Sequence, residues 1–363
     1  MTDSNVPFLD AAHGRVGSHT PVWFMRQAGR SLPEYKSVRG AGSILHAIKQ
    51  PDVAAEITLQ PVRRYGVDAA VLYSDIVVPP HAVGFGVDVS PGTGPVAEVP
   101  LRTAADLDRL RPLEVDDIDY VVDTVRLLVQ ELPTSVPLLA FAGAPFTVGS
   151  YLIEGRPSKD YRFTKTMMHA APGLFHEVME RLATSAITFI DAQLHAGARA
   201  FQLFDSWAGS LSLADYREFV LPHSTRVFAE LRSRHPGAPC VHFGIGCDHL
   251  LESMYDTMPE NGPRILGLDW RTRIGDARHR MGDGITVQGN LDPALVLAGK
   301  DAAIAGTDRV LQDNIVDGRR HPGHIFNLGH GVNQHSDPEV LGAIVDRVHA
   351  VTGSTAANAS ATV

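Results

Sequence analysis

Residues 21–35 read PVWFMRQAGRSLPEY. The apolar run Pro21–Met25 is followed at once by two arginines, Arg26 and Arg30, with Gly29 between them. An apolar run without polar alternation is typical of a strand that is covered on both faces. Guanidinium groups at the end of such a strand can each donate paired hydrogen bonds to a carboxylate or phosphate. The stretch therefore predicts a buried strand that leads into an anion-binding loop, with an ordinary basic surface loop as the alternative.

Apolar segments like this one recur along the chain, and amphipathic helical patterns lie between them. The expected strands are Val22–Met25, Ala69–Tyr73, Pro137–Phe141, Ala200–Phe204, Cys240–Phe243, Ile265–Leu268, Ile285–Val287 and His324–Asn327. The main expected helices are Asp52–Arg64, Val121–Leu132, Gly173–His195, Ala214–Arg234 and Pro338–Val351. Eight strands alternating with helices predict an α/β fold of the (β/α)8 TIM-barrel type. An open doubly wound sheet is the alternative, and the lack of GxGxxG after the first strand weakens its dinucleotide-binding form.

The organisation outside the repeating pattern is simple. We expect one barrel domain over residues 21–353, a flexible segment over 1–20 and a disordered tail over 354–363, whose sequence STAANASATV has no apolar pattern. The Gly- and Pro-rich stretch from Gly84 to Pro100 predicts an excursion, in the form of a hairpin, after the second strand.

The bulk composition excludes several classes of protein. The chain has 363 residues and a net charge of −9, which argues against a general nucleic-acid binder. Its two cysteines, Cys240 and Cys247, do not make a disulfide framework. We see neither a secretory signal at the N-terminus nor an apolar run long enough to span a bilayer. The expectation is a soluble cytoplasmic protein that binds neither membrane nor nucleic acid.

Polar residues and glycines gather directly after the expected strands. They are Arg26 and Arg30, Asp75, Gly143–Pro145, Asp205 and Ser206, Gly244 and Gly246, Asp269, Asn290 and His330, in strand order. In barrel enzymes the carboxyl ends of the strands form the rim that holds the active site. The positions of these residues therefore predict one functional site at that rim.

Asp75 is the most informative single residue of the set. It has apolar neighbours on both sides, with Val71 and Leu72 before it and Ile76–Val78 after it. A carboxylate so placed needs a partner, or it takes up a proton. One interpretation is a salt bridge to Arg26 or Arg30. The other is a functional carboxylate that accepts several N–H donors or stabilises a cationic intermediate.

Four motifs together resemble the uroporphyrinogen decarboxylase family. They are PVWFMRQAGRSLPEY (21–35), FAGAPFTVGSYLIEG (141–155), QLFDSWAG (202–209) and FNLGHGV (326–332). Further resemblance covers the segments at Arg39, 267–270 and 288–293, so the likeness extends from about Pro21 to about Val351. One departure is Ser31, where the family often has an aromatic residue.

The resemblance implies a substrate and a set of site residues. The substrate would be uroporphyrinogen III, a flexible tetrapyrrole with four acetate and four propionate arms. The implied catalytic residues are Arg26, Arg30 and Asp75, with Asp75 binding the pyrrole N–H groups. The implied substrate-binding residues are Arg26, Gln27, Ala28, Gly29, Arg30, Arg39, Asp75, Tyr151, Ser206 and His330. A homodimer is implied as well, and no metal ligand is expected in this site.

Several of these residues also have ordinary structural interpretations. Tyr151 suits a helix core with its hydroxyl satisfied, Ser206 suits a helix N-cap, His330 suits a solvent-facing loop and Arg39 suits a helix end. The glycines that flank His330 would allow its ring to approach a ligand closely. Asp269 and Asn290 are interpreted as structural caps and are not assigned to the site.

The implied reaction is decarboxylation of the four acetate arms to methyl groups, which gives coproporphyrinogen III and carbon dioxide without a cofactor. The protonated pyrrole ring would accept the electrons, and Asp75 would stabilise the resulting cation. The proton donor stays open among Arg26, Arg30, His330, Tyr151 and water.

Two rival functions remain from the sequence alone. The first is a zinc-dependent corrinoid or thiol methyltransferase on the same scaffold, which Cys240, His242 and Cys247 suggest. The second is a non-catalytic carrier of anionic tetrapyrroles. The arginines fit such a carrier, whereas Asp75 would weaken the capture of an anion.

Overall fold

The structure is a computed structural model and describes residues 6–29, 31–40, 42–90 and 92–353. Its centre is a sheet of seven parallel strands in the order β1-β4-β5-β6-β7-β8-β11. These strands are β1 (Ala70–Val71), β4 (Leu138–Gly143), β5 (Ala200–Asp205), β6 (Cys240–Gly244), β7 (Arg264–Gly267), β8 (Thr286–Gln288) and β11 (His324–Ile325). All seven coincide with expected strands, and their residues are buried almost throughout because helices cover the outer face.

The remaining expected strand, Val22–Met25, closes the barrel without forming a regular ladder. Val22 makes an isolated parallel bridge to Phe326, just after β11, and its carbonyl oxygen accepts the Asp68 N–H at 2.8 Å, just before β1. The segment therefore lies between the two edges of the sheet. The prediction of a strand here was wrong in detail, because side chains take N–H groups that a ladder would use: Asp68 accepts from Val22 N, Gln27 from Phe24 N and Asn327 from Met25 N.

The interior of the barrel contains a short polar chain. Trp23 Nε1 donates to Gln288 Oε1 at 3.0 Å, and Gln288 Nε2 donates to Gln202 Oε1 at 2.9 Å. These side chains come from the closing segment, β8 and β5, which are not neighbours in the sheet, so the chain crosses the barrel. All are at most 1 % exposed, and their mutual pairing satisfies polar groups that would otherwise be costly to bury.

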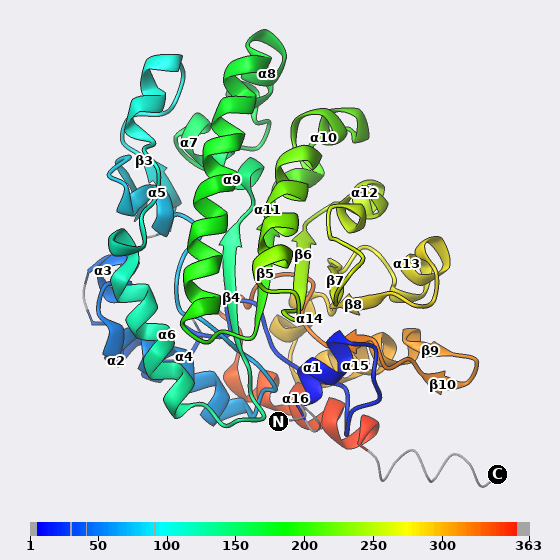
Figure 1. Cartoon of the computed structure of the whole chain (residues 1–363). Helices are drawn as coiled ribbons and strands as arrows, with labels where there is room; N and C mark the ends of the chain where they lie inside the picture. Colours follow the sequence, from blue (N-terminus) through cyan, green and yellow to red (C-terminus); the bar gives the residue numbers. More distant parts are fainter. Residues whose placement is uncertain (1–5, 30, 41, 91, 354–363) are drawn as a thin grey trace, which may run out of the picture.

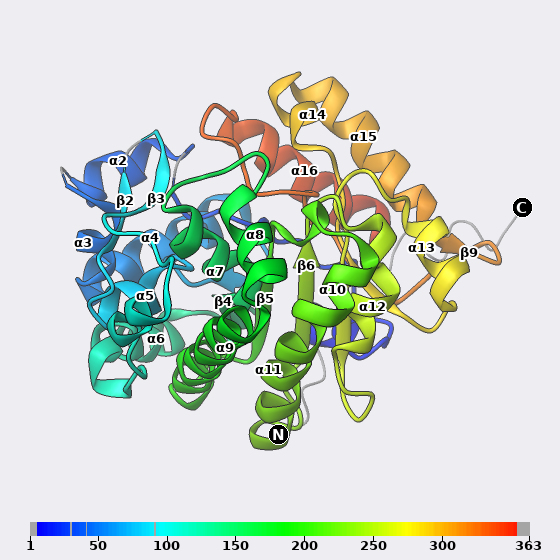
Figure 2. The same cartoon turned by 90° about the horizontal axis from the view of Figure 1, so that it is seen from above.

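Helices surround the strands, as the view from above shows (Figure 2). They are α1 (Pro7–Ala12), α2 (Pro33–Arg39), α3 (Ile44–Ile48), α4 (Pro51–Tyr65), α5 (Val78–Ala82), α6 (Asp119–Glu131), α7 (Pro145–Glu154), α8 (Arg162–Ala170), α9 (Pro172–His195), α10 (Leu213–Phe219), α11 (Leu221–Arg234), α12 (Leu251–Asp256), α13 (Ile274–Met281), α14 (Pro293–Leu297), α15 (Lys300–Asp313) and α16 (Pro338–Thr352). The expected single helix Ala214–Arg234 is two helices, because Pro222 lacks an N–H and its ring clashes with the preceding turn. The long helices α9 and α11 pack against each other, and α9 also contacts β4 and β5 (Figure 1).

The excursion after β1 is a hairpin, as the sequence predicts. Its antiparallel strands are β2 (Val87–Ser90) and β3 (Gly94–Ala97), with Val87 opposite Ala97. A second small hairpin, β9 (Ile315–Val316) with β10 (Arg319–Arg320), follows α15. The sequence did not signal this second hairpin.

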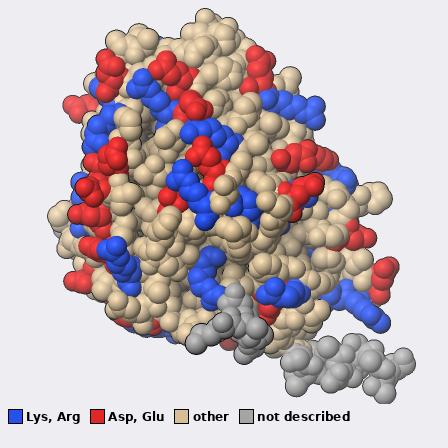
Figure 3. Space-filling view, viewed as in Figure 1, with Lys and Arg blue, Asp and Glu red and all other residues tan. Residues whose placement is uncertain are grey.

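The N-terminal segment is more ordered than the sequence suggests. Residues 7–12 form α1, whose residues are all buried and which contacts β11, so this part of the expected flexible segment is a packed helix. Residues 1–5 and the expected tail over 354–363 lie outside the described residues. Basic and acidic side chains are interspersed over the face that Figure 3 displays. No helix among the residues described is long and apolar enough to cross a membrane.

Candidate active site

A cleft opens at the carboxyl ends of the strands, where the sequence places the polar clusters. It consists of an inner cavity of about 160 Å³ and an outer cavity of about 1000 Å³. Arg26, Asp75 and His330 line both cavities, so the two form one continuous cleft. The three residues follow the closing segment, β1 and β11, which are neighbours around the barrel.

The floor of the inner cavity is aromatic. Phe141, Phe204 and Phe243 lie near the ends of β4, β5 and β6 and line this cavity. Their rings meet edge to face, with centroids 5.5 Å apart for Phe141 and Phe204 and 6.1 Å apart for Phe204 and Phe243. Such a surface suits the planar, weakly polar rings of a pyrrole better than it suits a free anion.

Arg26 is held in an unusual position. Its φ of 61° lies in the left-handed region, which non-glycine residues rarely adopt. Gly331, on the loop after β11, packs directly against its side chain, and a Cβ built at position 331 would lie 2.6 Å from Arg26 Cδ and 2.9 Å from Cγ. The glycine in the LGHG motif therefore leaves room for the stem of the arginine at the cleft wall.

Asp75 lies on the turn between β1 and α5. Its Oδ1 accepts the Val77 N–H at 3.1 Å, which fixes the carboxylate at the mouth of the inner cavity. The residue is half-buried, and Val77 and Val78, which follow it in the turn, are fully buried. The fixed turn thus presents one carboxylate to a largely apolar wall.

Tyr151 of α7 lines the outer cavity and packs against Trp207, with ring centroids 3.8 Å apart and ring planes tilted by 36°. Burial, reinforced by the negative charge of Asp75, raises the pKa of Tyr151 to about 12, while Arg26 opposes the shift. The phenol therefore stays neutral at physiological pH and is a hydrogen-bond donor rather than a ready acid.

The other predicted residues divide into those that line the cleft and those that do not. Ala28, Gly29 and Ser206 line the inner cavity, and Arg39 lines the outer one with its guanidinium 5.7 Å from the Tyr35 ring centroid. Gln27 is 1 % exposed and instead joins two backbone segments, because it accepts from Phe24 N and donates to the Ala69 carbonyl. Arg30 lies outside the described residues.

Sequence reasoning missed several residues of the cleft wall. Tyr35 and Tyr73 both line the inner cavity, and their hydroxyl groups are 3.0 Å apart. Burial and the neighbouring Tyr35 raise the pKa of Tyr73. The hairpin β2–β3 contributes Val89, Ser90 and the glycine-rich turn to the outer wall. Only the position of Tyr73 at the end of an expected strand could have indicated its role.

Asp269 and Asn290 are structural, in agreement with their interpretation as caps. Asp269 accepts from Arg271 N at 2.8 Å and from its guanidinium at 2.7 Å, and Asn290 Nδ2 donates to the Asp269 carbonyl at 2.8 Å. Both residues brace the loops after β7 and β8. Neither lines the inner or the outer cavity.

The residues that suggested a zinc methyltransferase do not form a metal cluster within the described chain. Cys240 Sγ contacts the Arg232 guanidinium at 3.4 Å, and His242 Nδ1 contacts Thr257 Oγ1 at 3.0 Å. Both side chains thus face the helices outside the barrel rather than the cleft. Burial raises the pKa of Cys240 to about 11, which disfavours the thiolate that zinc requires.

The fold and the cleft together define the class of protein: a parallel (β/α)8 barrel with an active-site-like cleft at the carboxyl rim. A methyltransferase from Methanosarcina mazei shares this fold with a TM-score of 0.74 at 17 % identity, over 94 % of this chain and 96 % of its own. The uroporphyrinogen decarboxylase (URO-D) family model matches residues 3–351. The uroporphyrinogen decarboxylases of Salinispora tropica and Saccharopolyspora erythraea are 51 % and 50 % identical over 95 % and 96 % of this chain, and over 90 % and 95 % of their own lengths. The chain belongs to the uroporphyrinogen decarboxylase family, and the resemblance read from its sequence motifs is confirmed.

Proposed function

We propose that this chain decarboxylates the four acetate arms of uroporphyrinogen III to methyl groups, giving coproporphyrinogen III and four CO2 in porphyrin and haem biosynthesis, without a cofactor. The observation that carries the proposal is the shared cleft of Arg26 and Asp75 above the aromatic floor. A cation for carboxylate arms, an anion for pyrrole N–H groups and an apolar surface for the rings are the three features that such a substrate needs.

The chemistry requires a temporary acceptor for the electrons of the breaking C–C bond. A proton added to a pyrrole ring carbon converts the ring into an iminium-like cation. Loss of CO2 from the acetate arm returns the electrons to this cation and leaves an exocyclic methylene, which a second proton converts to a methyl group. Loss of the ring proton restores the pyrrole, so each cycle exchanges one CO2 for one proton.

Asp75 would stabilise the cation by placing its carboxylate below the ring N–H groups. A fixed carboxylate in a partly desolvated site is worth more than one in water, because it needs no reorganisation as the charge develops. Arg26, Arg30, Arg39, Ser206 and His330 would bind the carboxylate arms, with Ala28 and Gly29 lining the same pocket. Gln27 would hold the turn that carries them through its bonds to Phe24 N and the Ala69 carbonyl. The proton donor remains among Arg26, Arg30, His330, Tyr151 and water, and the raised pKa of Tyr151 weighs against the tyrosine.

We also propose a domain organisation, an oligomeric state and a location. The chain would have one catalytic domain over residues 21–353, form a homodimer and work in the cytoplasm. Family membership supports the choice of substrate. Size-exclusion chromatography with light scattering tests the homodimer directly.

Product analysis with no added cofactor tests the reaction. Purified full-length protein is incubated anaerobically with uroporphyrinogen III, and the products are oxidised to porphyrins and separated by their number of carboxylates. We expect sequential loss of four carboxylates. Tight binding without turnover would identify a carrier instead, and a need for an added cofactor would contradict the mechanism.

The variant Asp75→Asn tests the role of the carboxylate. The amide oxygen can still accept the Val77 N–H, so the fold should persist. Activity should fall by about 100-fold or more, because the charge opposite the cationic ring is lost. Asp337→Asn is the matched control, since Asp337 Oδ1 also accepts a backbone N–H two residues further on and caps α16 outside both cavities, a role that asparagine also fills. Near-normal turnover by Asp75→Asn would show that the carboxylate does not stabilise a cation.

The variant Arg30→Ala extends the test to the second arginine of the motif. We expect weaker substrate binding, because one guanidinium for a carboxylate arm is lost. Unchanged affinity would place that guanidinium outside the binding site.

A further inference from the structure

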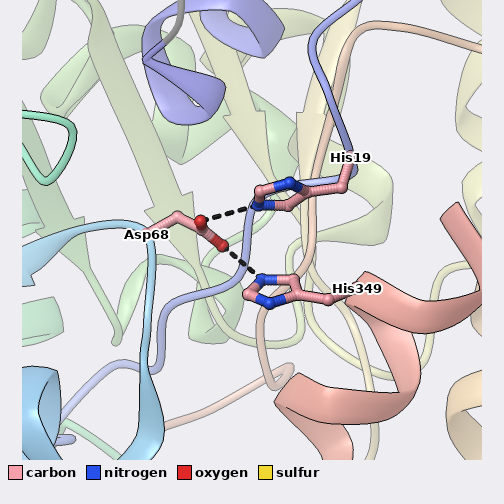
Figure 4. Close-up of side chains that lie close together, drawn as sticks. All are labelled: His19, Asp68 and His349. Carbon is pink, nitrogen blue, oxygen red and sulfur yellow. Dashed lines mark hydrogen bonds and ion pairs between the residues drawn. The ribbon is translucent and has the colours of Figure 1, made fainter. Parts of the chain in front are cut away.

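Three side chains from distant parts of the sequence meet at the end of the barrel opposite the cleft. His19 precedes the closing segment, Asp68 lies between α4 and β1, and His349 lies in the last turn of α16 (Figure 4). His19 and Asp68 both come before the strands that they lead into, whereas the cleft lies after the strands. The cluster is therefore separate from the proposed active site.

The geometry of the cluster is that of a compact ligand set. His19 Nε2 is 2.8 Å from Asp68 Oδ1, and His349 Nε2 is 2.8 Å from Asp68 Oδ2. The candidate ligand atoms of all three residues lie within 4.8 Å of one another. Two imidazoles thus approach the two oxygens of one carboxylate, with ring centroids 4.2 Å apart.

We propose that His19, Asp68 and His349 form a binding site for one divalent transition-metal ion, with zinc as the expected occupant. Two imidazole nitrogens and one carboxylate oxygen are three of the ligands that tetrahedral zinc takes in proteins, and water supplies the fourth. The side chains of His19 and His349 are 21 % and 29 % exposed, which leaves an open edge for the ion and its water.

The surroundings of the cluster favour a cation. Asp68 is the acidic member of the three and its side chain is 10 % exposed, and low exposure strengthens its attraction for a cation.

Neighbouring polar groups form hydrogen bonds with the side chains that would bind the ion. Ser18 Oγ is 2.9 Å from His19 Nδ1, and Val22 N donates to Asp68 Oδ2 at 2.7 Å. Hydrogen bonds of this kind orient metal-binding imidazoles and carboxylates and fix the tautomer. When zinc binds, the proton of the His19 ring would reside on Nδ1 and donate to Ser18 Oγ, which frees Nε2 for the ion.

A second cluster in the described chain provides an internal contrast. Asp191, His195 and His235 have similar spacing. However, the Arg234 guanidinium lies 3.0 Å from Asp191 Oδ2 and already supplies a positive charge there. A metal ion at that position would be repelled, so we expect no zinc site in the second cluster.

Zinc in the first cluster would have a structural role. Asp68 also binds the backbone of Val22, the residue that bridges the closing segment to Phe326. An ion held between His19, Asp68 and His349 would therefore join the start of the barrel to its last helix. Decarboxylation itself does not involve this ion.

Metal titration of the tag-free, chelator-treated full-length protein tests the proposal. We expect one zinc per chain by calorimetry and elemental analysis, and a visible absorption spectrum of tetrahedral type with cobalt(II) as the probe. Zinc at 100 times its dissociation constant should raise the melting temperature by about 3 °C. No saturable binding at micromolar zinc would overturn the proposal.

The variants His19→Gln and His349→Gln separate a metal site from a hydrogen-bonded triad. Glutamine can still donate an N–H to Asp68 but is a poor zinc ligand, so the apo protein should keep its stability. Zinc affinity should fall by at least about tenfold, since even the loss of an outer partner costs that much. His195→Gln, in the second cluster, is the matched control and should leave zinc affinity unchanged. Equal affinity in His349→Gln and the wild type would refute the site.

A further variant keeps the test decisive if the glutamine variants do not fold. Ser18→Ala removes only the hydroxyl behind His19 and should weaken zinc binding by about tenfold while the fold persists. Unchanged zinc affinity in this variant would contradict the arrangement. Decarboxylase activity in chelator-treated protein is measured separately, so a failure of this proposal is distinct from a failure of the proposed function.

Discussion

The substitution Gly331→Ala should impair catalysis while leaving the fold intact. Gly331 does not have a positive φ, so its backbone accepts alanine without strain. The new Cβ, however, would lie 2.6 Å from Arg26 Cδ and 2.9 Å from Cγ, whereas carbon atoms in contact are about 3.5–4.0 Å apart. The arginine stem must therefore move by about 1 Å.

A displacement of this size should have little effect on the stability of the fold but a large effect on the rate of catalysis. The clashing atoms belong to a flexible side chain, which can move into the cleft without unfolding the barrel. A misplacement of about 1 Å in a substrate-positioning group can cost about 100-fold in rate. We therefore expect kcat/KM to fall by about 10- to 100-fold, which corresponds to about 1.4–2.7 kcal/mol of transition-state stabilisation.

The assay is the rate of product formation across a range of uroporphyrinogen III concentrations, together with thermal unfolding. Gly237→Ala is the matched control, because nothing lies within 4 Å of a Cβ at that position and its φ is not positive. We expect the control to match the wild type in both measurements. If kcat/KM of Gly331→Ala stays within about twofold of the wild-type value, the position of Arg26 does not limit catalysis.

Three further predictions concern stability. Tyr35→Phe should lower the free energy of unfolding by about 1 kcal/mol in denaturant titration. The double variant with Tyr73→Phe should lose less than the sum of the two single losses, because the two hydroxyls pair at 3.0 Å. Strict additivity of the two losses would contradict this pairing. Asp68→Asn should be less stable than the wild type at neutral pH: the folded-state pKa of this carboxylate is lowered, so its stabilisation is present above its unfolded pKa of about 4 and is lost as the pH falls through the folded value. Melting temperatures that differ equally at pH 7 and pH 3 would refute that linkage. Gly342→Ala should stabilise α16 by about 0.5–1 kcal/mol, since its Cβ would meet only Tyr65 at 3.9 Å, and a lower melting temperature would show hidden crowding.

The repeating pattern of the sequence was sufficient for the barrel, because strands covered on both faces are continuous apolar runs. It was insufficient where side chains replace backbone pairing, as in Val22–Met25, whose N–H groups bind Asp68, Gln27 and Asn327. It also failed to divide α10 from α11, because the apolar period continues across the break and only Pro222 marks it.

The candidate site was predictable where a residue lies shortly after the carboxyl end of a strand, as Asp75, Ser206 and His330 do. The cleft wall was less predictable, because residues such as Tyr35 and Ser90 reach it from a short helix and a hairpin whose path depends on packing. Gln27 was placed less well by its motif, because it lies inside the arginine motif, yet its side chain bonds to two backbone segments and lines neither cavity.

The closing of the barrel by Val22 and Phe326 has a consequence for the order in which the newly synthesised chain can fold. Val22 is synthesised well before Phe326, the residue to which it bridges. The two edges of the sheet can therefore be joined only after the segment at Phe326 has left the ribosome.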